Sequence, residues 1–170
     1  MITPGFTHLL RFLALLLLQV FVLNNVVITG MFNPYVYVYF VLALPMSIPR
    51  AGLLVLSFLA GLTVDYFSHS LGIHAFTCTL IGFVRPYMFN LIQPPGGYSN
   101  EDRPAIGSMG FGWYVRYALP LLFVFHLVLF LLETLSANQL LFVLSKAAAS
   151  TAVATAIVVL FEFFFSKRTR

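Results

Sequence analysis

The sequence has very little charge. Only 8% of its 170 residues are Asp, Glu, Lys or Arg, whereas 61% are hydrophobic, and the mean hydropathy is +0.97. Soluble domains have about 25% charged residues, and a soluble chain of this size must expose much of its surface to water. The scarcity of charge therefore excludes an ordinary soluble fold and leaves the lipid bilayer as the solvent.

Cysteine is equally scarce. Cys78 is the only one in the chain, which excludes an internal disulfide, and its apolar surroundings suit a small packed residue. The net charge of +4 is small and scattered along the chain, which argues against a nucleic-acid-binding surface. We interpret the basic residues as signals of membrane orientation instead.

Catalytic motifs are missing as well. The sequence has no Walker phosphate loop, no H-E-x-x-H pair and no nucleophile elbow. Asp65, His69 and His74 have a spacing that approaches a metal site, but a zinc ion requires three or four well-placed ligands. We therefore predict no enzymatic activity, no metal and no cofactor.

Long apolar runs fill most of the chain. A spanning helix needs about 20 apolar residues, with a range of roughly 17–25. The first run is longer than a signal-peptide core and has no A-x-A-like cleavage site after it, so we expect a retained helix. The runs predict an all-α polytopic membrane protein, a compact bundle of about six transmembrane helices in a single domain over residues 1–170. The predicted helices cover residues 9–28, 32–48, 52–67, 71–92, 113–135 and 140–165, and a cytoplasmic loop covers residues 93–112.

The run over residues 32–48 contains two competing patterns. Asn33 and Pro34 suit the start of a helix, and Pro45 should kink its end. Residues 35–39 read Tyr-Val-Tyr-Val-Tyr, an alternation typical of a strand. Because a lone strand leaves its backbone unpaired in lipid, we predict a helix here.

The basic residues predict the topology. If both termini are cytoplasmic, every Lys and Arg except Lys146 lies at or near the inner side. The predicted outer connections, residues 24–31, 68–70 and 136–138, contain no Lys or Arg. This distribution follows the positive-inside rule.

Asp65 is the first of four polar residues that we single out within the predicted helices. It shares a helix face with Ser57, Gly61 and His69, and the small Ser57 and Gly61 allow a neighbour to approach closely. A charge at the bilayer centre costs about 2.5–3.5 kcal/mol on insertion scales. Two interpretations stay open: a buried polar contact with another helix or a partner, or a carboxylate at a helix end that meets water.

Three further polar residues lie in the last two predicted helices. Lys146 is about 10 Å into the last helix, where it can snorkel to the outer surface or pair with Asp65 or Glu133. His126 and Glu133 share a face and suit a structural contact or a proton relay. Small residues between positions 145 and 156 suit close packing, within the bundle or against a partner.

Seven short motifs occur in order and cover all but the last helix and the tail. They are Leu23-Asn24-Asn25, Gly30 to Tyr35 with Asn33 and Pro34, Gly61 to Ser68 with Asp65, Leu71 to Ala75 with Gly72 and His74, Arg85-Pro86-Tyr87, Phe111-Gly112-Trp113, and His126 to Glu133. Their order and spacing, with the total length, resemble the rod shape-determining protein MreD family.

The resemblance implies a multi-pass protein of the bacterial inner membrane. It implies a non-catalytic scaffold of the cell-elongation complex that helps to control lateral peptidoglycan synthesis. MreC is the implied direct partner, and MreB, RodA and a class B penicillin-binding protein belong to the same complex. The helix count is also similar to that of substrate-binding subunits of energy-coupling-factor vitamin transporters, which is the alternative function.

Overall fold

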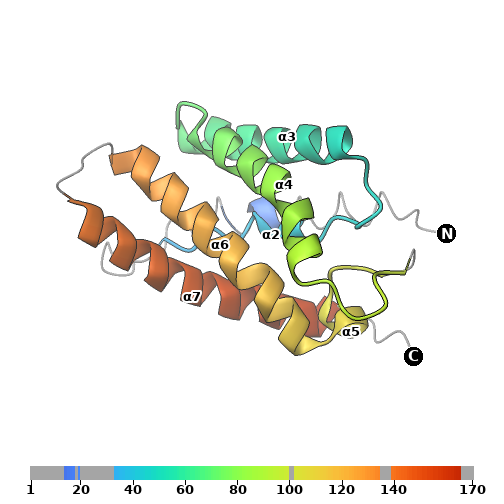
Figure 1. Cartoon of the computed structure of the whole chain (residues 1–170). Coiled ribbons are helices and arrows are strands. Elements are labelled where there is room, and N and C mark those ends of the chain that lie inside the picture. Colours follow the sequence, from blue (N-terminus) through green and yellow to red (C-terminus); the bar gives the residue numbers. More distant parts are fainter. Residues whose placement is uncertain (1–13, 18, 20–32, 100–101, 135–138, 166–170) are drawn as a thin grey trace.

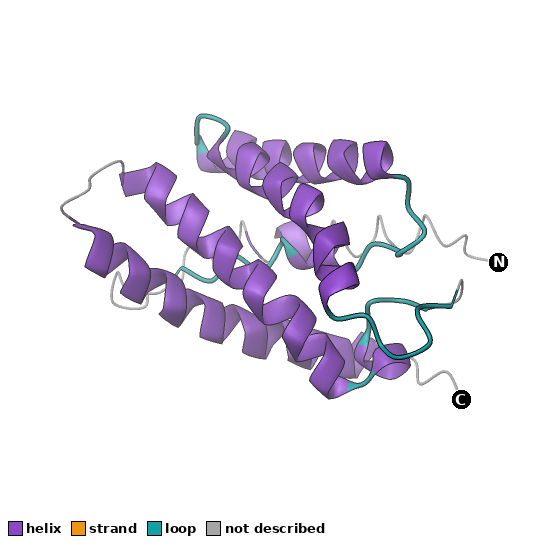
Figure 2. Cartoon of the chain, viewed as in Figure 1, coloured by secondary structure: helices purple, strands orange, loops and turns teal. Residues whose placement is uncertain are grey.

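The computed structural model describes residues 14–17, 19, 33–99, 102–134 and 139–165. Within these ranges the all-α prediction is confirmed, since Figure 2 shows only helices and loops there. Most of the predicted first helix lies outside the described residues, although residues 14–17 are helical. Asn24, Asn25 and the basic tail from residue 167 to 170 also lie outside them.

Four long helices form the body of the structure. They are α3 (Arg50–Ser68), α4 (Ile73–Leu91), α6 (Phe111–Thr134) and α7 (Leu140–Phe165), which overlap the predicted ranges 52–67, 71–92, 113–135 and 140–165. Among the described residues, three helices (α3, α6 and α7) are long and apolar enough to cross a membrane. The length and composition of these helices are those of a membrane protein. The number of six spans remains a prediction.

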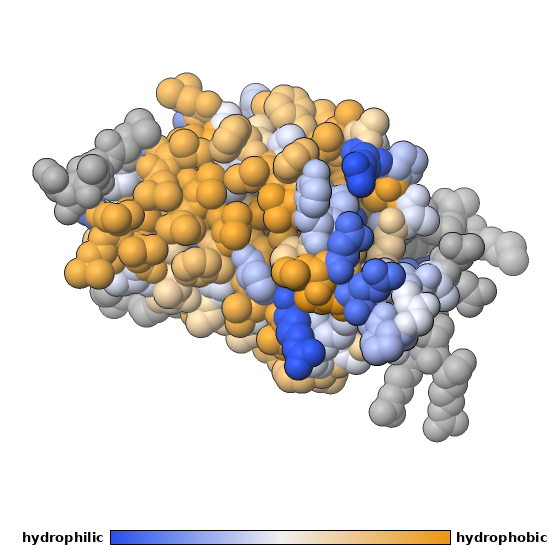
Figure 3. Space-filling view, in the orientation of Figure 1, coloured by the Kyte–Doolittle hydropathy of each residue, from blue (hydrophilic) through white to orange (hydrophobic). Residues whose placement is uncertain are grey.

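The long helices form two antiparallel hairpins, α3–α4 and α6–α7. The hairpins pack against each other through α4 and α6 (Figure 1). We call the end with the α3–α4 turn the hairpin end; α6 also ends there. We call the opposite end, where the chain passes from α4 to α6, the loop end. On the face seen in Figure 3, hydrophobic side chains cover the hairpin end and the middle, whereas hydrophilic side chains gather at the loop end.

A mostly non-helical segment, residues 33–49, runs through the interior of this bundle. We call it the core segment. Its only helical part is the single turn α2 (Tyr39–Leu42). Five of its side chains are at most 1% exposed: Val36, Tyr37, Val38, Val41 and Leu42. The core segment therefore contacts protein, and not lipid, along most of its length.

The structure corrects the predicted spanning helix over residues 32–48. That prediction assumed that a non-helical backbone would meet lipid with unpaired groups. Irregular backbone is tolerated at membrane depth where protein surrounds it, and here both faces of the Tyr-Val alternation are buried. The helical turn ends at Leu42. Pro45 contributes to this end, because a proline disfavours the helical conformation of the residue before it, here Leu44.

Small residues bring α3 and α4 into close contact. A Cβ atom added to Gly61 would lie 2.5 Å from the Cα atom of Ala75 and would also strike the His74 carbonyl. One turn or so away, Ser57 faces Gly82, where an added Cβ would lie 2.5 Å from the Ser57 hydroxyl. Large residues at these positions would push the two backbones apart.

Gly61→Ala is therefore expected to destabilise the protein by about 1–3 kcal/mol, the usual cost of overpacking. The gain in helix propensity, about 0.5–1 kcal/mol, is smaller because the clash is with backbone and not with a flexible side chain. Gly52→Ala on the same helix is the matched control, since its Cβ would meet only Ile48 at 3.8 Å. The free energy of unfolding of both variants, measured in mixed detergent micelles with circular dichroism as the signal, tests this prediction. Equal stability of the two variants would contradict the close contact.

The loop end is tied to the helices by aromatic residues. The predicted loop over residues 93–112 contains a short helix, α5 (Ile106–Met109), and α6 begins within it at Phe111. The Tyr98 hydroxyl donates to the Phe89 carbonyl at 2.8 Å, and the Trp113 ring N–H donates to the Ile92 carbonyl at 3.2 Å. Burial raises the pKa of Tyr98, so its hydroxyl keeps the proton that it donates.

Candidate functional site

Polar side chains from the surrounding helices hold the backbone of the core segment. Three of its amide N–H groups donate to side chains distant in sequence: Asn33 to Ser150 Oγ (3.2 Å), Tyr35 to His126 Nε2 (3.2 Å) and Val36 to Gln19 Oε1 (2.8 Å). Buried backbone groups must be paired to avoid a large desolvation cost. These side chains replace the pairing that a helix would give.

His126 has both ring nitrogens engaged. Its Nε2 accepts from the Tyr35 amide, so the ring hydrogen lies on Nδ1. Nδ1 lies 2.8 Å from the Leu122 carbonyl and 3.3 Å from the Thr151 hydroxyl, and the side chain is fully buried. Both ring nitrogens thus hold neighbouring groups in place, which is the geometry of a structural contact.

Glu133 and Lys146 meet beside the start of the core segment. Glu133 Oε1 accepts from the Tyr35 hydroxyl at 3.3 Å, and Glu133 Oε2 lies 3.8 Å from Lys146 Nζ. Lys146 Nζ also lies 4.2 Å from the centre of the Phe130 ring, a cation–π distance. Because both charged side chains are partly exposed, the pair contributes at most about 1 kcal/mol. Its effect is to fix how α6, α7 and the core segment fit together.

Asp65 caps the start of α4 from the neighbouring helix. Its Oδ1 accepts from the Ser70 hydroxyl (2.6 Å) and the His74 amide (3.1 Å), and its Oδ2 accepts from the Ala75 amide (2.7 Å). Gly72 occupies the N-cap position and has no side chain to supply this function. The first-turn amides of a helix are unpaired and favour a negative charge. Asp65 is 4% exposed and lies in a buried contact with another helix.

His74 connects this cap to the core segment. Its Nδ1 lies 2.9 Å from the Tyr37 hydroxyl, and its ring packs edge-on against Tyr35 with centroids 5.0 Å apart. His69, by contrast, occupies the left-handed position that ends α3. Within the described ranges, no three His, Cys, Asp or Glu side chains are placed to hold a metal ion.

Arg85 holds the other half of the core segment. Its Nε donates to the Tyr117 hydroxyl at 2.7 Å, and its Nη2 donates to the carbonyls of Leu42 (3.4 Å) and Leu44. Tyr117 donates in turn to the Leu42 carbonyl at 2.9 Å. Arg85 is 1% exposed, and its guanidinium lies 4.9 Å from the centre of the Phe89 ring. One side chain thus joins α4, α6 and the end of α2.

Glu162 on α7 is a further buried carboxylate, which the sequence analysis did not single out. Its Oε1 accepts from the Tyr39 hydroxyl at 2.5 Å, and its Oε2 accepts from the Ile106 amide at 3.1 Å. It is 4% exposed. A carboxylate inside an apolar helical run indicates a buried partner, and that signal was present in the sequence.

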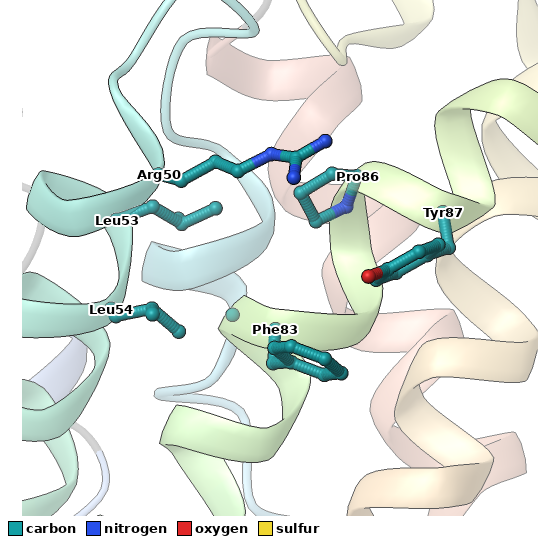
Figure 4. A pocket seen from close by; sticks show the side chains of 7 residues that line it. Arg50, Leu53, Leu54, Phe83, Pro86 and Tyr87 are labelled. Atoms are coloured by element: carbon teal, nitrogen blue, oxygen red, sulfur yellow. The ribbon is translucent and has the colours of Figure 1, made fainter.

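A small groove lies between α3 and α4 near the loop end. Its volume is about 100 Å³, and Figure 4 shows the side chains around it. Its lining comes from Arg50, Leu53 and Leu54 on α3 and from Gly82, Phe83, Pro86 and Tyr87 on α4. Enclosed ligand pockets usually measure about 300–1,000 Å³, so this groove is too small to enclose a whole small molecule.

The sequence matches no family model, no curated protein and no solved structure. The resemblance to the MreD family therefore depends on the motif residues themselves. Of these, Asn33, Gly61, Asp65, Gly72, His74 and Arg85 lie at the contacts described above. Pro86 lines the groove beside Arg85, and Pro34 follows Asn33 at the start of the core segment.

Proposed function

We propose that the protein is a non-catalytic scaffold of the bacterial cell-elongation complex, located in the inner membrane as a multi-pass protein. In this proposal it binds MreC directly. Through MreC it acts with MreB, RodA and a class B penicillin-binding protein to help control lateral peptidoglycan synthesis. Six spans with both termini in the cytoplasm belong to the same proposal.

The observation that supports this proposal most strongly is where the motif residues lie. Gly61, Asp65, His74 and Arg85 each make a contact that positions α3, α4 or the core segment. Motif residues with structural roles favour a shared fold over a shared reaction. Such an internal framework is what a scaffold needs, because its surface must keep one shape for a partner.

The distribution of charge supports the proposed orientation. Arg50 begins α3 at the loop end, Arg103 lies in the chain between α4 and α6, and Arg116 lies in the second turn of α6. All three lie in elements of the loop end, and hydrophilic side chains gather at that end on the face seen in Figure 3. By the positive-inside rule, this loop end is the cytoplasmic one.

Small residues on α7 offer a surface for the membrane helix of MreC. They divide between two faces: Ala147, Ser150 and Ala154 are fully buried against the bundle, whereas Ala148, Ala152 and Ala156 are exposed. The exposed three recur every fourth residue and so form one stripe. Small residues at this spacing let a second helix approach closely, and we place the MreC helix on this stripe.

The transporter alternative has one observation in its favour. Irregular backbone surrounded by helices at membrane depth is also how many transporters build their substrate sites. In this protein the N–H groups of Asn33, Tyr35 and Val36 are already paired with side chains. A vitamin-binding subunit should also retain a small molecule through purification, which distinguishes the two functions.

Recovery of partners from native membranes tests the proposal. The tagged protein is solubilised in mild detergent, captured, and analysed by mass spectrometry, with an unrelated tagged polytopic protein as the background. We expect MreC and wall-synthesis enzymes above background. Ala152→Phe should lower MreC recovery about fivefold or more, because a bulky ring blocks close helix packing. Val55→Phe, an exposed position on α3, is the matched control and should leave recovery unchanged.

One outcome counts against the scaffold, and another counts against the α7 stripe. Recovery of transporter ATPases or a bound vitamin-like molecule would favour the alternative function. Recovery of MreC that is equally reduced by Ala152→Phe and Val55→Phe would leave MreC as the partner but remove the α7 stripe as its binding face.

A further inference from the structure

The groove between α3 and α4 is apolar and open along one side. Leu53, Leu54 and Gly82 line it, and Phe83 and Tyr87 flank it with 55% and 54% of their surfaces exposed. A space of about 100 Å³ with exposed apolar walls suits a short stretch of hydrocarbon chain. In a membrane, acyl chains are the most abundant groups of that kind.

A positive charge lies at the mouth of this groove. Arg50 is the first residue of α3, and Figure 4 shows its side chain extending over the groove toward Pro86 of α4. Arg50 is exposed, and within the described part of the chain it forms no ion pair. Its guanidinium fork fits the oxygens of a phosphate group.

The exposed surface beside the groove favours lipid over a protein helix. The outward side chains of α3 are large and apolar: Val55, Phe58, Leu59 and Leu62 are 44–56% exposed. The small residues Gly61, Ser57 and Gly82 face the α3–α4 contact instead. Helix–helix interfaces in membranes are enriched in small residues, so this face is built for contact with acyl chains.

We propose that the groove binds one anionic phospholipid, with an acyl chain along Leu53, Leu54 and Phe83 and the headgroup phosphate on Arg50. Basic pockets between membrane helices at the cytoplasmic side are a known form of anionic-lipid site. Arg50 begins α3 at the loop end, and hydrophilic side chains gather at that end on the face seen in Figure 3. The inference rests on the proposed orientation, in which the loop end is cytoplasmic, and does not depend on MreC.

Native mass spectrometry of the full-length protein tests the site. The detergent-purified, delipidated protein is titrated with phosphatidylglycerol or phosphatidylcholine of the same chain length. We expect one phosphatidylglycerol to bind about fivefold more tightly than phosphatidylcholine, the preference that one basic residue confers on anionic lipid. Arg50→Gln should remove that preference. Arg116→Gln, which removes the same charge from an exposed position on α6, should preserve it.

A second variant and a second probe complete the test. Leu54→Trp, which fills the groove, should weaken phosphatidylglycerol binding while Arg50 remains in place. Glycerol phosphate, a headgroup without acyl chains, should not compete. The proposal is overturned if Arg116→Gln reduces the preference as much as Arg50→Gln, if Leu54→Trp binds like the wild type, or if glycerol phosphate displaces the lipid.

Discussion

Arg85→Ala is expected to destabilise the protein by about 3–5 kcal/mol, more than any other single change considered. The substitution empties a site that is 1% exposed, and a large-to-small change in a core leaves a cavity. It also leaves the Leu44 carbonyl without its donor and the Leu42 carbonyl with Tyr117 alone, and an unpaired buried acceptor costs about 1–3 kcal/mol. Removal of the guanidinium also removes the cost of burying its charge. The expected destabilisation is therefore smaller than the sum of the cavity cost and the hydrogen-bond cost.

Matched variants separate the causes of this loss. Arg85→Met keeps most of the volume and removes the donors, so its loss, about 1–3 kcal/mol, measures the hydrogen bonds. Arg85→Lys keeps the charge but lacks the planar fork that reaches two elements. Arg116→Ala, on an exposed part of α6, should change stability by less than about 0.5 kcal/mol. The measurement is equilibrium unfolding in mixed micelles, and equal losses for Arg85→Ala and Arg116→Ala would refute the role given to Arg85.

Asp65→Ala is expected to destabilise the protein by about 2–3 kcal/mol. Loss of a helix cap costs about 0.5–2 kcal/mol, and hydrogen bonds to a charged group are stronger than neutral ones. The variant leaves the His74 and Ala75 amides unpaired in a buried place. Asp65→Asn should lose less, because one acceptor oxygen remains.

The control for this prediction is Asp102→Ala. Asp102 also accepts a backbone N–H, from Ser99 at 2.7 Å, but this bond is exposed, so water can replace it. We expect a loss below about 1 kcal/mol. Similar losses for Asp65→Ala and Asp102→Ala in the same unfolding assay would show that Asp65 is solvated, as in the interpretation that places it at a water-facing helix end.

The four long helices could be predicted because their signals are local. Three of them, α3, α6 and α7, are long and apolar enough to cross a membrane, and α4 lies in a mainly apolar run. The polar stretch that separates α4 from α6 is rich in Pro and Gly. The core segment could not be predicted in this way. Its hydrogen-bond partners lie far along the chain: Ser150 is 117 residues from Asn33, His126 is 91 from Tyr35, and Arg85 is 43 from Leu42.

The polar residues of the predicted helices show the same limit. A shared helix face for His126 and Glu133 follows from their spacing, but nothing in the sequence indicates that both reach Tyr35. The closeness of Ser57, Gly61 and Asp65 to α4 was implied by small residues on one face, since these allow close approach. Which partner each polar group meets depends on how the helices pack, and one sequence does not contain that information.

The central feature of this fold is the core segment, a mostly non-helical stretch held by side chains inside the bundle. Its most direct test is nuclear magnetic resonance of the ¹³C- and ¹⁵N-labelled protein in nanodiscs, which detects scalar coupling across an N–H···N hydrogen bond. We predict coupling between the Tyr35 amide nitrogen and His126 Nε2, which lie 3.2 Å apart, and its loss in His126→Ala. Absence of that coupling in the folded wild type, together with helical carbon shifts through residues 33–48, would contradict the account.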